Sequence, residues 1–126
     1  MQLQYSVTFN PPYVEVHVSG EPDYLSTNLM WKKIASACER HECRNILGIA
    51  ETETRSSDHA YDHAAIFEAA GITAEFRIAW VETNRDAIDM AKLVEAVVRN
   101  RGLAEARVFD NVQKAKKWLT KASAAN

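Results

Sequence analysis

The stretch NILGIA, Asn45–Ala50, decides the fold of this chain. It is a short and almost uninterrupted apolar run, and a strand of that composition is typically covered on both faces of its sheet. Sheets covered in this way have mostly parallel strands, with helices as the crossovers between them. We therefore expect Asn45–Ala50 to be a central strand of an α/β protein.

The residues before this strand predict a hairpin and a helix. Tyr5–Phe9 and Tyr13–Val18 alternate apolar and polar residues, as half-buried strands do. Asn10–Pro12 between them predicts a turn, since two prolines cannot continue a sheet ladder. From Tyr24 to Arg40 the apolar residues recur at helical spacing, which predicts a helix leading into the central strand.

The residues after the central strand alternate between helical and strand patterns. Apolar residues at helical spacing should be buried against the sheet, and turn or cap residues mark the ends. The expected order is a helix from about Asp58 to Gly71, a strand over Glu75–Val81, a helix capped by Thr83 or Asn84 that buries Met90, Leu93, Val94, Val97 and Val98, a strand over Glu105–Phe109, and a helix capped by Asp110 with Trp118 facing inward.

This order predicts an α/β fold. We expect a mostly parallel five-stranded sheet with an antiparallel N-terminal hairpin at its edge, and helices packed against it through right-handed crossovers. The 126 residues form one domain, 1–126, by the usual size of domains. A sheet edge or apolar helix surface left uncovered would suit a homodimer.

Composition narrows the function classes. No run of adjacent basic residues exceeds two, which argues against nucleic acid as a partner. No apolar run approaches the length of a membrane span, and no secretion signal follows Met1. With only two cysteines, Cys38 and Cys43, we expect a cytoplasmic protein with reduced thiols. Neither a glycine-rich phosphate loop nor a dinucleotide fingerprint occurs, so we expect no cofactor and no enzymatic activity.

The polar stretch ETETRSSDHAYDHAA, Glu51–Ala65, allows three interpretations. Ser56 or Ser57 can be the N-cap of the following helix, and this is favoured over a phosphorylation site. His59 and His63 lie four residues apart, so on a helix both rings could reach one metal ion. A metal is disfavoured, because a third ligand is not evident and the zincin pattern is missing.

Aromatic residues suggest a pocket. Trp80 lies near the carboxyl end of a predicted strand, where open α/β sheets bind ligands. Trp31 lies beside the apolar helix stripe, where we expect partial exposure, and Tyr61 comes from the polar stretch. Together the three could line an apolar pocket, although plain core packing is the favoured alternative.

The chain resembles the STAS superfamily, the anti-sigma-factor-antagonist-like fold, and within it the SpoIIAA-like branch that shares its description with a class of lipid-binding domains. The resemblance covers nearly the whole chain. It rests on YVEVHVSGEP opening into a long helix, on NILGIAE, on FRIAWVE, and on the ending ARVFDNVQKAKKWL. It implies a non-catalytic binding module with a pocket for a small apolar or amphipathic ligand.

The resemblance also implies an alternative function. Phosphoswitch members of the superfamily carry an Asp-Ser-Ser-Gly stretch after the central strand, and a kinase that is also the anti-sigma factor phosphorylates one of its serines. The corresponding stretch here is Arg55–Asp58, which keeps the tandem Ser56 and Ser57 but replaces the flanking Asp and Gly. The alternative is a protein-interaction switch phosphorylated at Ser56 or Ser57.

Overall fold

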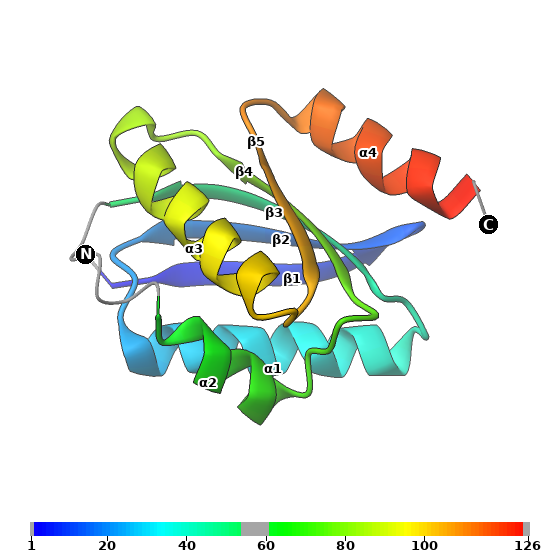
Figure 1. Cartoon of the computed structure of the whole chain (residues 1–126), viewed down its shortest axis with the longest axis horizontal. Helices are drawn as coiled ribbons and strands as arrows, with labels where there is room; N and C mark the ends of the chain where they lie inside the picture. The colour runs from blue at the N-terminus through cyan, green and yellow to red at the C-terminus, as the bar shows by residue number, and fades with distance from the viewer. Residues whose placement is uncertain (1, 54–60, 125–126) are drawn as a thin grey trace.

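A computed structural model describes residues 2–53 and 61–124, with side chains as far as Thr120. Figure 1 shows its strands and helices along the chain. They are β1 (Gln4–Asn10), β2 (Tyr13–Gly20), α1 (Tyr24–Arg40), β3 (Asn45–Thr52), α2 (His63–Ala70), β4 (Arg77–Glu82), the short 3-10 helix η2 (Arg85–Ala87), α3 (Ile88–Asn100), β5 (Glu105–Phe109) and α4 (Val112–Ala124).

The five strands form one sheet in the order β1-β2-β3-β4-β5. β1 pairs antiparallel with β2, and the other neighbours are parallel, which confirms the predicted fold class. Each crossover moves one strand along in the same direction, so right-handed connections bring α1, α2 and α3 to one face of the sheet. The last helix, α4, packs against the other face, over β3, β4 and β5.

Alternate residues of the strands therefore build two core layers, one on each face of the sheet. Between the sheet and the first three helices lie Val14, Val16, Val18, Ile34, Ile46, Ile66, Phe67, Ile78 and Val98, all buried. Between the sheet and α4 lie Tyr13, Leu47, Ala79, Val81, Ala115 and Leu119. β3 contributes to both layers, as its unbroken apolar run predicted.

Two predicted helix starts are wrong. α2 begins at His63 rather than near Asp58, because Tyr61 and Asp62 form a turn, and residues 54–60 lie outside the described part. α4 is capped by Asn111 rather than Asp110, since the Asn111 Oδ1 accepts the Lys114 N–H at 2.8 Å. The caps at Asn84 and the stop at Gly71, which has a φ of 84°, are confirmed.

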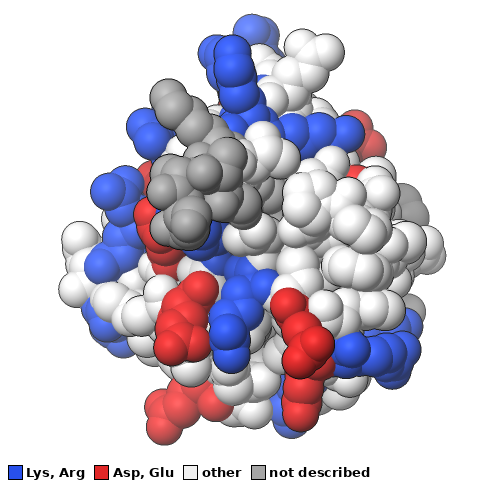
Figure 2. All heavy atoms as spheres, turned by 90° about the vertical axis from the view of Figure 1, so that its right-hand side faces the viewer, with Lys and Arg blue, Asp and Glu red and all other residues white. Residues whose placement is uncertain are grey.

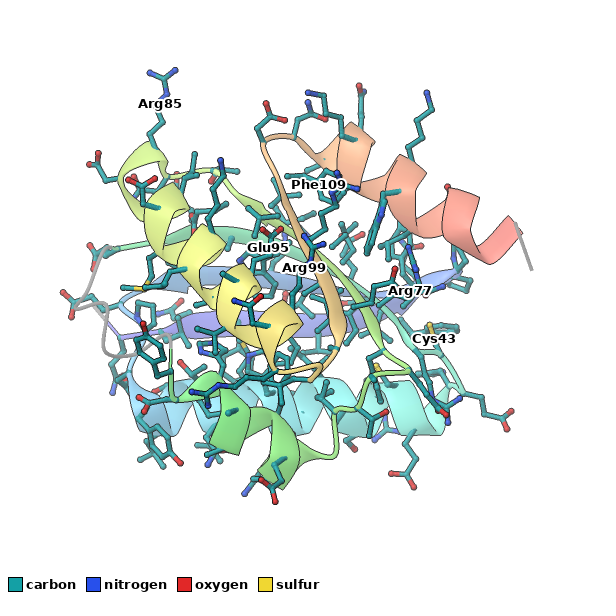
Figure 3. All side chains as sticks on the ribbon, viewed as in Figure 1. Cys43, Arg77, Arg85, Glu95, Arg99 and Phe109 are labelled. Atoms are coloured by element: carbon teal, nitrogen blue, oxygen red, sulfur yellow. The ribbon has the colours of Figure 1, made fainter. Side chains whose placement is uncertain are left out.

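Trp118 is only half-buried, although it faces the sheet as predicted. Its ring centroid lies 5.7 Å from that of Phe109 on β5, and the Arg77 guanidinium lies over it at 4.1 Å (Figure 3). Arg77 also pairs with Glu105 on the neighbouring strand. The cation covers the indole, so the second core layer ends in a stacked pair rather than in solvent.

Charges of both signs are mixed on the surface seen in Figure 2, where basic and acidic side chains lie next to one another in the lower half of the view. Such mixing is typical of a solvated surface rather than of a basic patch. Within residues 2–53 and 61–124, every helix is too short or too polar to cross a bilayer.

Gly48 of β3 allows a close approach of a side chain from the neighbouring strand. It lies directly opposite Trp80 of β4, and a Cβ atom added to Gly48 would collide with the six-membered ring of the Trp80 indole. The indole therefore lies across β3, in the space that any other residue at position 48 would fill.

We predict that Gly48→Ala lowers the free energy of unfolding by about 1–3 kcal/mol, because the added methyl must displace a packed indole. Urea denaturation measures the change. In a Trp80→Leu background the same substitution should cost clearly less, since the colliding ring is gone. An equal cost in both backgrounds would contradict this contact.

The two cysteines differ in their surroundings. Cys38 is buried in the core layer under α1, and this burial raises the pKa of its thiol to about 12. Cys43 is half-buried in the loop after α1.

Since the thiolate is the reactive form, we predict that iodoacetamide at about pH 8 alkylates Cys43 in the folded protein and Cys38 only after unfolding. Peptide mass spectrometry of samples labelled before and after denaturation measures the alkylation of each cysteine. Rapid labelling of Cys38 in the folded protein would refute the prediction.

Candidate functional site

A cavity of about 140 Å³ lies between the sheet and the three helices on its first face. It is close to the carboxyl ends of β3 and β4, the position at which open α/β sheets bind ligands. An engineered apolar cavity of about this size admits benzene in another protein, so a single ring or a short chain would fit. Its walls are mainly apolar, and they include Val18, Met30, Trp31, Ile66, Phe67, Ile78, Trp80, Met90, Val94 and Val98.

Three aromatic side chains from three elements form one wall. The ring of Trp31 on α1 stacks on that of Trp80 on β4, with centroids 5.8 Å apart and planes at 29°. The same indole meets Phe67 of α2 edge-on at 4.7 Å. Trp31 is 4% exposed, so the expected partial exposure of this residue is wrong. Its burial arises because α2 covers the face of α1 that the sequence alone left open.

The opposite wall is α3. Val97 and Val98 are buried as predicted, but Met90, Leu93 and Val94 are only half-buried, which corrects the predicted stripe. Met90 and Val94, with Ala91 between them, line the cavity rather than meeting a packed surface. The helical period correctly identifies the inward face, whereas the depth of burial depends on the space beneath α3.

A buried carboxylate holds the ends of two strands together beside the cavity. Glu82, the last residue of β4, is 3% exposed and accepts hydrogen bonds from the Thr52 N–H at 3.0 Å, the Thr52 hydroxyl and the Asn84 N–H at 3.1 Å. Asn84 returns a bond from its side-chain amide to the Thr52 carbonyl at 2.6 Å. Burying a carboxylate is costly unless it is hydrogen-bonded, and these donors stabilise it.

A second carboxylate joins α3 to the edge strand. The Glu95 Oε2 accepts the Val108 N–H of β5 at 2.6 Å, and Figure 3 shows this side chain between the helix and the strand. Glu95 also lines the cavity.

The charged side chains around the cavity are predominantly acidic. Among the described lining residues, the acids are Asp23, Glu53, Asp62, Glu82 and Glu95, and Arg107 is the one Lys or Arg. Asp23 is also the N-cap of α1, where it accepts the Ser26 N–H at 2.8 Å. This distribution gives the cavity a negative potential, which disfavours an anionic ligand.

The predicted site residues are only partly brought together. Trp31 and Trp80 line the cavity, and so does His63, whose ring meets Phe67 edge-on at 5.9 Å. Tyr61 is 55% exposed and does not line the cavity, which corrects its place in the predicted pocket. The reason is the turn that precedes α2.

Ser56, Ser57 and His59 lie outside the described residues, so the phosphorylation and metal hypotheses stay predictions. Within the described part of the chain, no group of three or more His, Cys, Asp or Glu side chains converges on a point that a metal ion could occupy.

Sequence reasoning missed Glu82, Glu95 and Ala91. A carboxylate directly after the apolar strand pattern of β4 is a signal for Glu82, since a charge that continues a strand needs partners there. No pattern in the sequence points to Glu95, because its acceptor role depends on the edge of β5 lying below α3.

Comparison with models of known protein families finds none that matches the chain, and comparison with curated proteins finds no relative.

We predict that Glu82→Gln lowers the free energy of unfolding by about 1–3 kcal/mol, because the amide places two donors where the carboxylate accepted bonds from Thr52 and Asn84. Chemical denaturation measures the loss. Glu68→Gln, at an exposed carboxylate of α2, is the matched control and should change stability by less than about 0.5 kcal/mol. Similar losses in both variants would refute a structural role for Glu82.

Proposed function

We propose that this chain is a non-catalytic binding module of the STAS, SpoIIAA-like type that holds a small ligand in the cavity between α1, α2, α3 and the sheet. The observation that carries the proposal is the stacked pair of Trp31 and Trp80 in the wall of an apolar space of about 140 Å³. Aromatic faces set beside unfilled apolar space are typical of ligand pockets. The resemblance of the chain to the SpoIIAA-like branch supports the same class of function.

The cavity favours a ligand with an apolar body of about one ring. A larger rigid body would have to displace α3, whose Met90 and Val94 form the opposite wall. The five carboxylates among the described lining residues favour a neutral or cationic polar end over an anionic one. An amphipathic amine or alcohol satisfies both conditions.

Binding rather than catalysis is supported by what the carboxylates near the cavity already do. Glu82 accepts three hydrogen bonds from Thr52 and Asn84, and Glu95 accepts the Val108 N–H. Asp23 caps α1. A general base needs a lone pair directed at the substrate, whereas these three carboxylates accept hydrogen bonds from backbone N–H groups and, in Glu82 and Asp23, from hydroxyl groups of neighbouring residues as well.

Replacing each of two alanines on α3 by phenylalanine tests the site. Ala91 lines the cavity and Ala96 is exposed on the same helix, so Ala91→Phe fills the space while Ala96→Phe adds the same group to the surface. We use 2-phenylethylamine, 2-phenylethanol and phenylacetate as probes that share one ring and differ in charge. Shifts of the Trp31 and Trp80 indole N–H signals in NMR titrations report binding.

We expect the amine and the alcohol to bind the unmodified chain more tightly than phenylacetate. Ala91→Phe should weaken binding by at least about tenfold, which is about 1.4 kcal/mol, and Ala96→Phe should leave it unchanged within about twofold. Equal affinities in the two variants would overturn the site. A preference for phenylacetate would overturn the charge assignment alone.

Mass spectrometry of protein purified from its own host separates this proposal from the phosphoswitch alternative. A bound ligand adds mass in the native spectrum that disappears on denaturation. Phosphorylation at Ser56 or Ser57 adds the mass of a phosphate group that remains after denaturation. The second result without the first would favour the protein-interaction switch.

A further inference from the structure

The two edges of the sheet differ in how they are protected. Exposed backbone N–H and C=O groups at an edge can pair with another strand, and proteins usually block them with charges or covering groups. At the β5 edge, Glu105 and Arg107 carry opposite charges, and the Glu95 side chain accepts the Val108 N–H at 2.6 Å. This edge is therefore blocked.

Among the residues that the structure describes, the β1 edge carries no comparable protection. Its sequence, QYSVTFN over Gln4–Asn10, has seven residues with neither a charge nor a proline. All seven are in register with β2 on one side, without a bulge. Because neighbouring residues of a strand direct their backbone groups to opposite sides, the alternate set of N–H and C=O groups in β1 points away from β2.

The apolar layer of the core also reaches this edge. Tyr5, Val7 and Phe9 pack against the core below α1 but are only half-buried. The Lys33 ammonium lies 5.9 Å above the Tyr5 ring, and His41 stacks on Phe9 with ring centroids 4.1 Å apart. Lys33 of α1 and His41, the residue that caps this helix, thus cover the two aromatic rings from above. A strand paired with β1 would bury the outer side of this apolar row further.

We infer that β1 pairs antiparallel with β1 of a second copy of this chain, so that two sheets join into one sheet of ten strands. A two-fold axis at Val7 places like residues together. Val7 lies opposite Val7 of the partner subunit, and Tyr5 opposite Phe9 of the partner subunit. On the other face, Ser6 lies opposite Thr8 of the partner subunit.

A second copy is the occupant because the strand is complementary to itself. In this register apolar residues meet apolar residues on the helix-covered face, and uncharged polar residues meet on the open face. Pairing of one strand with its own copy about a two-fold axis is antiparallel and closed. A parallel arrangement would place different residues of the strand in different environments in the two copies.

The double variant Ser6→Lys/Thr8→Lys tests the pairing. Both residues are exposed on the open face, and in the dimer each new lysine would lie opposite a lysine of the other copy. His17→Lys is the control, since His17 is 53% exposed on the same face but belongs to the inner strand β2. Thermal unfolding followed by circular dichroism verifies that each variant remains folded.

Sedimentation velocity over a range of concentrations gives the mass. We expect the unmodified chain and His17→Lys to reach twice the 14.2 kDa of one chain, and the double lysine variant to remain at 14.2 kDa while folded. An unmodified chain that stays monomeric up to the highest concentration measured would overturn the inference. So would a dimer that survives the double substitution, as one built on the exposed Leu25 and Leu29 of α1 would.

If the double variant unfolds, hydrogen exchange of the backbone amides in the unmodified chain tests the pairing instead. Pairing predicts that the β1 amides directed away from β2 become more protected as protein concentration rises, while the β5 amides do not change. Protection of β1 that is independent of concentration would overturn the inference.

Discussion

The missing side chain at Gly48 is the constraint on which the rest of the structure depends. Because position 48 carries no Cβ, the Trp80 indole can lie across β3. There it stacks on Trp31 of α1, and Trp31 in turn meets Phe67 of α2. One small residue in the central strand thus determines how the first two helices approach the sheet, and it leaves the space that α3 encloses from the other side.

The polar groups near this space hold the carboxyl ends of the strands in place. Glu82 and Asn84 join β4 to Thr52 at the end of β3 through reciprocal hydrogen bonds. Glu95 joins α3 to β5 in a similar way. A cavity normally lowers stability through the contacts that its walls lose. Here the hydrogen-bonded carboxylates hold β3, β4, α3 and β5 in place. The elements around the cavity therefore stay together although its apolar walls do not pack against one another.

The sequence was sufficient for the order, type and approximate bounds of the strands and helices, because the periods of strands and helices differ and turn residues separate them. It located the inward face of α3 but not how deeply Met90 and Val94 are buried, since depth depends on neighbours from distant segments. The same limit explains why Trp31 was expected to be partly exposed. Of the candidate site, Trp31 and Trp80 were predicted. Glu82 was missed, although a charge at the end of the apolar β4 pattern is a local signal for it. Glu95 acts through a tertiary contact that no local pattern encodes.

The hydrogen bond from Val108 to Glu95 also limits how far such a sheet can grow. A sheet with two open edges can add copies without end, as fibrils do, and exposed edges of this kind lead to aggregation. In the dimer proposed above, two sheets join at β1, and each outer margin is then a β5 strand whose Val108 N–H is already bonded to Glu95. Growth of the sheet would then end at two chains.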